Sequence, residues 1–207
     1  RRAPEFNVKR SDLLDGLLIG VPVAIVGARL FYVLFAPAGE IQSFADVLNI
    51  RNGGLSIIGA ILMVAVFALI FCHFKKIKVG NILDLVSLGF LIGQAVGRWG
   101  NFMNREVYGV ETTLPWGMSL DGGVPRHPLF LYESLWNLVG FVFLAIWTRK
   151  GKRQYDGQAT LLYFVWYGLI RFLLEPLRTS PLLIPGTALR SSQVIGGGMC
   201  LVALVIL

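Results

Sequence analysis

The densest group of polar side chains in this sequence lies in residues 97–109, GRWGNFMNREVYG, at the end of an apolar run. Arginine, asparagine and glutamate alternate there with glycine; the residues are Arg98, Asn101, Asn104, Arg105, Glu106, Gly100 and Gly109. A helix cap followed by a solvated loop explains one or two such residues, whereas this number indicates irregular backbone that lines a cavity. The planar, permanently charged fork of arginine suits a pair of phosphate oxygens, so the motif favours phosphate binding.

A second polar set lies in residues 126–140, RHPLFLYESLWNLVG. It places His127, Tyr132, Glu133 and Asn137 at the start of a predicted helix. Because Glu133 and Asn137 are four residues apart, we expect both side chains on one face of that helix.

A third set lies in residues 167–178, YGLIRFLLEPLR, where Tyr167, Arg171 and Glu175 form one helical stripe. Charge within a membrane segment is functional by default, which favours a functional Arg171 and, in the first motif, a functional Arg98. An ordinary intrahelical ion pair explains Glu175 equally well, and this alternative stays open here.

Composition excludes a soluble protein. Of the 207 residues 55% are hydrophobic and 15% charged, and the mean hydropathy is +0.67, more apolar surface than a short soluble fold can bury. The net charge of +7 is compatible with a nucleic-acid partner, but its distribution indicates membrane topology instead. Cys72 and Cys200 lie in apolar runs and the only histidines are His73 and His127, so we expect no disulfide and no metal-ligand cluster.

Six apolar windows are long enough, or nearly so, to cross a bilayer. They are residues 13–36, 54–74, 80–98, 128–147, 159–177 and 191–207. The fold class expected is therefore an all-α, polytopic integral membrane helix bundle, with residues 1–207 as a single transmembrane domain.

Basic residues orient these windows. Eleven of the 19 lysines and arginines fall in residues 1–12, 75–79 and 149–158, which lie on one side if each window spans once. By the positive-inside rule this side is the cytoplasm. The extracytoplasmic connections are then 37–53, 99–127 and 178–190. The eight basic residues left are all arginines, and snorkelling to the interface suffices for Arg51, Arg126 and Arg190.

The motif 97–109 resembles the signature of the prolipoprotein diacylglyceryl transferase family, and the resemblance continues in order along almost the whole chain. Further matching segments are residues 27–32, 53–56, 127–133 and 167–172, followed by Glu175 and Arg178. The resemblance implies transfer of the diacylglyceryl group of phosphatidylglycerol to the lipobox cysteine thiol of a prolipoprotein. It also implies a bacterial plasma (inner) membrane enzyme, expected to be monomeric, whose active site faces the extracytoplasmic leaflet and needs no cofactor.

The same resemblance suggests roles for the polar residues. Arg98 and Arg171 are assigned to the phosphate, and His127 and Tyr167 are the ionisable catalytic candidates. The other candidates bind or orient substrate; they are Arg29, Tyr32, Asn101, Asn104, Glu106, Gly109, Glu133, Glu175 and Arg178.

The sequence departs from the family in three respects. The family pattern includes a further span ahead of residue 1, so seven are expected in the full-length protein. Ile58 stands where the family usually has histidine or tyrosine, and Arg51 where an aromatic is common. Because Ile58 cannot accept a proton, a family member that binds or transports phospholipid without catalysis is the alternative. A purely structural membrane subunit is a third hypothesis, which leaves Arg98 and Arg171 without a purpose.

Overall fold

The structure is a computed structural model that describes residues 2–37, 40–41, 43–50, 53–119, 122–179, 183–184, 186–187 and 189–207. Helices dominate, and the described residues form isolated β-bridges but no strand. The predicted all-α class is confirmed. The chain divides into two compact units, residues 1–82 and 83–207, which are described separately.

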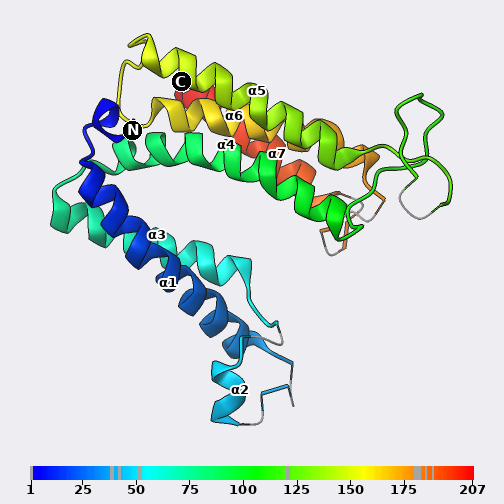
Figure 1. Cartoon of the computed structure of the whole chain (residues 1–207), viewed down its shortest axis with the longest axis horizontal. Coiled ribbons are helices and arrows are strands. Elements are labelled where there is room, and N and C mark those ends of the chain that lie inside the picture. Colours follow the sequence, from blue (N-terminus) through cyan, green and yellow to red (C-terminus); the bar gives the residue numbers. More distant parts are fainter. Residues whose placement is uncertain are drawn as a thin grey trace. The chain divides into compact units, whose positions relative to one another are not determined.

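The first unit is built on two antiparallel helices, α1 (Arg10–Phe35) and α3 (Ile57–Lys75), with the short helices η1 (Ala3–Phe6) and α2 (Phe44–Leu48) (Figure 1). At one end Lys75 pairs with Asp12 at 3.0 Å and Asp15 at 2.8 Å. Near the other end a Cβ on Gly27 would collide with the Gly59 carbonyl, and the reverse also holds. Small residues therefore let the two backbones touch.

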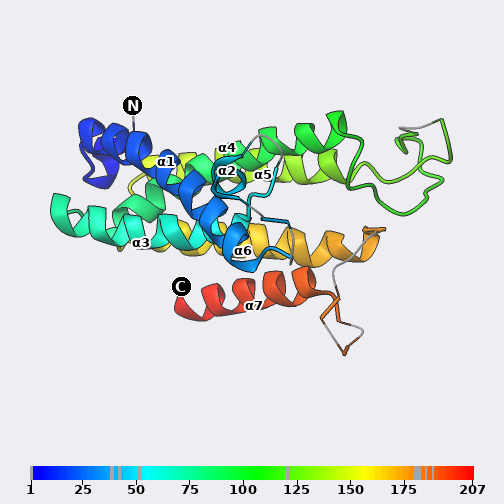
Figure 2. The same ribbon diagram turned by 90° about the horizontal axis from the view of Figure 1, so that it is seen from below.

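The second unit contains most of α4 (Val79–Met103), then α5 (Leu129–Arg149), α6 (Gln158–Leu174), the 3₁₀ turn η2 (Glu175–Leu177) and α7 (Ser191–Ile206). Helix α7 lies alongside α6 in both views (Figures 1 and 2). Gly168 and Gly196 make that contact possible, since a Cβ on either would meet the carbonyl of the other. Helix α6 ends at Leu174, just before Pro176, which lacks the backbone N–H that a continuing helix needs.

At one end of the second unit the carboxylate of Asp84 joins α4 to α6. Asp84 is fully buried and accepts hydrogen bonds from the backbone N–H groups of Gly157 and Thr160, both at 2.8 Å. The Thr160 hydroxyl donates a further bond at 2.8 Å, and the Arg153 guanidinium pairs with the same carboxylate at 3.0 Å. Asp84 thus caps the N-terminus of α6 from a neighbouring helix, which fixes the register of α4 and α6.

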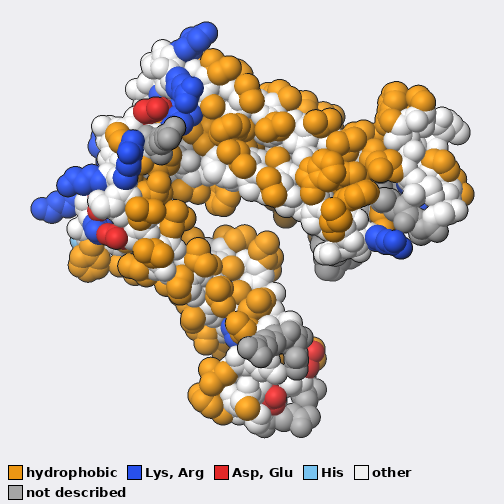
Figure 3. Space-filling view, in the orientation of Figure 1, with side chains coloured by type: hydrophobic (Ala, Val, Ile, Leu, Met, Phe, Trp, Pro, Cys, Tyr) orange, Lys and Arg blue, Asp and Glu red, His pale blue; other side chains and the backbone are white. Residues whose placement is uncertain are grey.

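The six predicted windows coincide with α1, α3, α4, α5, α6 with η2, and α7. Five of these helices are long and apolar enough to cross a membrane, and α7 is apolar but only 16 residues long. Figure 3 shows hydrophobic side chains covering the lengths of the helices, as expected where lipid is the solvent.

One expectation for α4 is wrong. The helix continues to Met103, so Arg98 and Asn101 lie on regular helix and irregular backbone begins only at residue 104. Polar side chains on a regular helix can line a polar interior without breaking the backbone, which sequence patterning alone does not reveal.

Candidate active site

A single buried carboxylate, Glu133 on α5, joins two arginines from two other helices. Its Oε2 contacts Nη2 of Arg98 on α4, and its Oε1 lies 3.4 Å from Nη1 of Arg171 on α6. Glu133 is 2% exposed, and both guanidinium groups are largely buried. Charges this far from water persist only when paired, so the three helices are tied together by their polar side chains.

The ion network continues from Arg171 to the end of α6. Nη2 of Arg171 lies 3.3 Å from Oε2 of Glu175, and Nη1 of Arg178 lies 4.0 Å from the same oxygen. Arg190 donates a hydrogen bond to the Glu175 backbone carbonyl. The intrahelical pair left open by the sequence therefore exists, but as one part of a larger network.

This network carries an excess of positive charge. Three arginines, 98, 171 and 178, face two carboxylates, Glu133 and Glu175, which leaves a net charge of +1 before Arg190 is counted. Positive charge held in place within a partly dry site attracts an anion strongly. The arrangement therefore suits a phosphate group.

The turn after α4 carries the remaining polar residues of the 97–109 motif. Nη1 of Arg98 donates to Oδ1 of Asn101 at 3.3 Å, and Nδ2 of Asn104 donates to Oε1 of Glu106 at 2.6 Å. Val107, a β-branched residue, adopts a φ of 61°, in the left-handed region that such residues rarely occupy. Strained backbone is concentrated at functional sites, which is consistent with a role for this turn.

Gly109 allows two segments of the end loops to meet. Its N–H donates to the His127 carbonyl at 3.1 Å, and an added Cβ would lie 2.8 Å from that oxygen. The next residue, Val110, donates through its N–H to the Leu177 carbonyl at 2.8 Å. These bonds bring residues 108–110, 127 and 177–179 together beside the ion network, which accounts for glycine at this position.

The ring of His127 lies beside Tyr132. Nδ1 of His127 is 3.3 Å from Oη of Tyr132, which also accepts a hydrogen bond of 2.8 Å from the Trp116 indole. Both rings are partly exposed. His127 is thus a partly exposed side chain whose ring nitrogen has a neutral hydrogen-bonding neighbour.

Tyr167 occupies the turn of α6 before Arg171 and stacks on Tyr163, with ring centroids 5.8 Å apart. Tyr163 accepts a hydrogen bond of 2.8 Å from Nε2 of Gln94 on α4. This stack extends the polar side chains of the ion network along the interior of the second unit.

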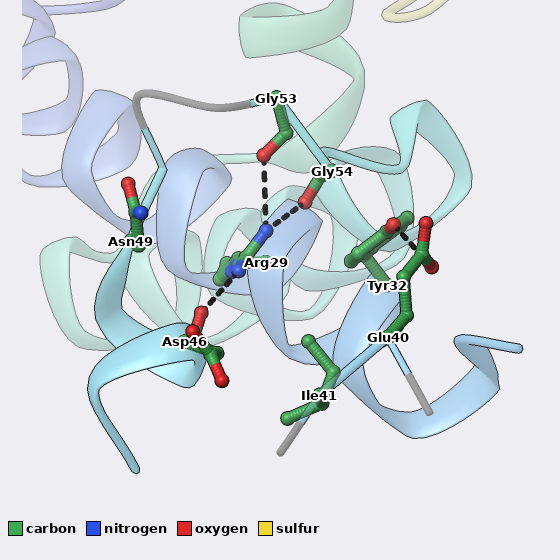
Figure 4. Close-up of a pocket in the computed structure, with 8 residues that line it drawn as sticks. All are labelled: Arg29, Tyr32, Glu40, Ile41, Asp46, Asn49, Gly53 and Gly54. Carbon is green, nitrogen blue, oxygen red and sulfur yellow. Dashed lines mark hydrogen bonds between the residues drawn. The ribbon is translucent and has the colours of Figure 1, made fainter. Parts of the chain in front are cut away.

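Arg29 and Tyr32 belong to the first unit, where they line a cavity of about 230 Å³ with Glu40, Asp46 and the glycines at 53 and 54 (Figure 4). Arg29 donates to the carbonyls of Asp46, Val47 at 2.9 Å, Gly53 at 3.0 Å and Gly54 at 2.7 Å. Most of its hydrogen-bonding capacity is therefore used to hold residues 46–47 and 53–54.

The hydroxyl of Tyr32 donates to Oε2 of Glu40 at 2.6 Å in the same cavity. Ile58, the second residue of α3, has 55% of its surface exposed and offers no group that can accept a proton. Arg51 lies outside the described residues. Among the residues that the structure describes, no three His, Cys, Asp or Glu side chains gather as a metal site would require.

Sequence analysis missed Arg190 and Asp84. Arg190 was explained as an interface residue, whereas its guanidinium reaches the end of α6. Asp84 could have been identified from the sequence, because it is a carboxylate within an apolar window. A charged side chain in a membrane segment is expected to have a pairing partner.

The fold and this network define an α-helical, multi-pass membrane protein with an arginine-rich polar site among its helices. All 207 residues match the family described as prolipoprotein diacylglyceryl transferase, and the chain belongs to that family. Relatives named phosphatidylglycerol–prolipoprotein diacylglyceryl transferase are 41% identical in Finegoldia magna (91% of this chain, 75% of the relative) and 41% in Streptococcus mutans (93% and 76%). A third relative, from Streptococcus equi subsp. zooepidemicus, is 35% identical, and the match covers 99% of this chain and 81% of the relative.

Proposed function

We propose that this protein transfers the diacylglyceryl group of phosphatidylglycerol to the lipobox cysteine thiol of a prolipoprotein. The observation that carries the proposal is the pair of arginines, Arg98 and Arg171, held by one buried Glu133 in a network of net positive charge. Family membership supplies the reaction, and this network supplies groups suited to its anionic donor.

In the reaction, the cysteine sulfur bonds to the terminal glycerol carbon of the diacylglyceryl group. The bond from that carbon to the phosphate oxygen breaks, and its electron pair leaves with glycerol phosphate. The thiol proton is lost to a base or to solvent. The donor phosphodiester carries one negative charge, and the leaving phosphomonoester develops a second as the bond breaks.

Charge development on the phosphate is the step that the network is suited to assist. Preorganised cations stabilise a growing negative charge more strongly in a dry site than in water. We assign this role to Arg98 and Arg171, with Asn101 as a hydrogen-bonding partner of Arg98. Glu133 and Glu175 keep the guanidinium groups in place, and Arg178 adds positive charge beside Glu175.

Activation of the thiol does not require a histidine at position 58. A free thiol with a pKa near 8.5 is already a few per cent thiolate at neutral pH, and nearby arginine charge increases that fraction. His127 and Tyr167 are our candidates for accepting the proton, because both are ionisable and only partly buried. Asn104, Glu106 and Gly109 shape the turn that borders the site.

We place the protein in the bacterial plasma membrane with this site toward the extracytoplasmic leaflet. Lysines are confined to residues 9, 75–78 and 150–152, whereas the ion network lies at the opposite end of α5 and α6 from residues 150–152. The positive-inside rule assigns the lysine-bearing end to the cytoplasm.

The proposal is tested by incubating membranes that contain the full-length protein with phosphatidylglycerol and a lipobox peptide. We expect a gain in peptide mass equal to a diacylglyceryl group, and none when the cysteine is replaced by serine. Binding of phosphatidylglycerol without transfer would support the non-catalytic lipid-binding alternative, which the named relatives do not favour.

A further inference from the structure

Three polar residues form a second layer one helical turn away from the arginine layer. Gln94 precedes Arg98 by four residues on α4, and Tyr167 precedes Arg171 by four on α6. Asn137 follows Glu133 by four on α5. Because α5 runs antiparallel to α4 and α6, all three displacements point the same way, about 6 Å along the helix axes.

The two layers differ in charge. The outer layer of Arg98, Glu133 and Arg171 is ionic, whereas the inner layer consists of two carboxamides and a phenol. Hydrogen bonds join α4 to both neighbouring helices near these layers, since Gln94 donates to Tyr163, one turn before Tyr167 on α6, at 2.8 Å. The Ser134 hydroxyl, next to Glu133, also donates to the Ala95 carbonyl of α4 at 2.9 Å.

Asn137 is the most unusual member of the inner layer. Its side chain is 1% exposed, yet neither its Oδ1 nor its Nδ2 has a hydrogen-bond partner among the described residues. The buried Oε1 of Gln94 also has none within the described part of the chain. Burying such groups unpaired is costly, and more so where lipid replaces water, so a hydrogen-bonding ligand at this level is favoured.

We propose that Asn137 hydrogen-bonds the acyl ester carbonyls of the donor lipid and so makes the site selective for diacyl over dialkyl lipids. The inference rests on the proposed function. A glycerophospholipid has an anionic phosphate and, a few covalent bonds deeper in the membrane, neutral ester carbonyls. An ionic layer followed by a neutral layer with a free N–H donor matches that sequence of groups.

The ligand chemistry follows from the groups present. An ester carbonyl accepts hydrogen bonds but brings no charge, so a neutral amide donor suits it better than another arginine would. An ether oxygen lacks the carbonyl, and a lipid with ether chains would leave Nδ2 of Asn137 buried without a partner. Sites built to hydrogen-bond a substrate group discriminate against analogues that lack it for this reason.

The test compares diacyl with dialkyl-ether phosphatidylglycerol of matched chain length, in vesicles, as donors for the full-length protein. We expect native protein to prefer the diacyl lipid by about tenfold or more in kcat/KM, the equivalent of a hydrogen bond. In Asn137→Leu we expect the preference to fall below about twofold. Leu138→Val, at a lipid-exposed neighbour on α5, should keep the native preference.

Thermal unfolding separates a binding role from a structural one. Asn137 has no partner within the described chain, so Asn137→Leu should unfold at or above the native temperature. Equal use of both lipids by native protein, or a preference that survives in Asn137→Leu, would overturn the inference. A marked loss of thermal stability in Asn137→Leu would also overturn it, because it would reveal a structural partner. Failure of native protein to use either lipid would instead contradict the proposed function.

Discussion

Arg98 and Arg171, on different helices and 73 positions apart in the sequence, are held together by the two oxygens of one carboxylate, that of Glu133. Two guanidinium groups repel one another, so their proximity depends on that shared partner. The arrangement concentrates positive charge while keeping each arginine's fork in a defined orientation.

Replacing Arg98 by lysine should therefore abolish most of the activity, although charge is retained. Lysine is a point charge that cannot keep Glu133 and a phosphate oxygen pair in the same plane. We expect kcat/KM for diacylglyceryl transfer to fall by about 10²-fold or more. Arg149→Lys, at an exposed position at the far end of α5, is the control and should be tolerated. Near-native turnover in Arg98→Lys at matched expression would remove Arg98 from this role.

Glu133→Gln should destabilise the protein as well as impair it. The neutral glutamine no longer compensates the charges of Arg98 and Arg171, which are both largely buried. Removing one partner of a buried ion pair costs about 3–5 kcal/mol of stability. Chemical unfolding in detergent measures the difference. Glu111→Gln, at an exposed loop position, is the matched control. Equal stability of Glu133→Gln and native protein would show that the ion pairs contribute no net stability.

Gly109→Ala should reduce transfer by about 10²-fold while the membrane helices remain folded. The new Cβ would displace the His127 backbone and with it the loop beside the ion network, and small misplacements at a site cost activity of this order. Gly123→Ala in the same loop meets no atom of the described residues within 4 Å and should leave activity nearly unchanged. Comparable activity in the two variants would contradict the positioning role of Gly109.

Particular residues show how much of the fold and of the candidate site can be predicted from the sequence. Apolar length alone locates the six helices α1, α3, α4, α5, α6 and α7, because a bilayer requires a continuous apolar run. Sequence spacing also predicts the shared face of Glu133 and Asn137, since both are buried on α5. It does not predict that Glu133 bridges two helices or that Arg190 reaches α6, because pairings between distant segments depend on how helices pack.

The orientation of the protein is tested by cysteine labelling in intact cells, in a background with Cys72 and Cys200 replaced by alanine. A cysteine at Ser119, in the 104–128 loop, should react with an impermeant thiol reagent. A cysteine at Lys152, in the basic connection between α5 and α6, should be shielded until the cells are permeabilised. The reverse pattern would place the arginine network on the cytoplasmic side.

The central claim is that arginine charge, rather than a base at position 58, enables the transfer. The most direct measurement is the rate of diacylglyceryl transfer against pH for native full-length protein and for Ile58→His. General-base catalysis typically contributes about 10²–10⁴-fold, but a thiol near Arg98 and Arg171 already supplies thiolate. We therefore predict that the native protein is active and that Ile58→His changes the rate by less than about tenfold at every pH. A native protein inactive at every pH, together with an active Ile58→His variant, would contradict the account.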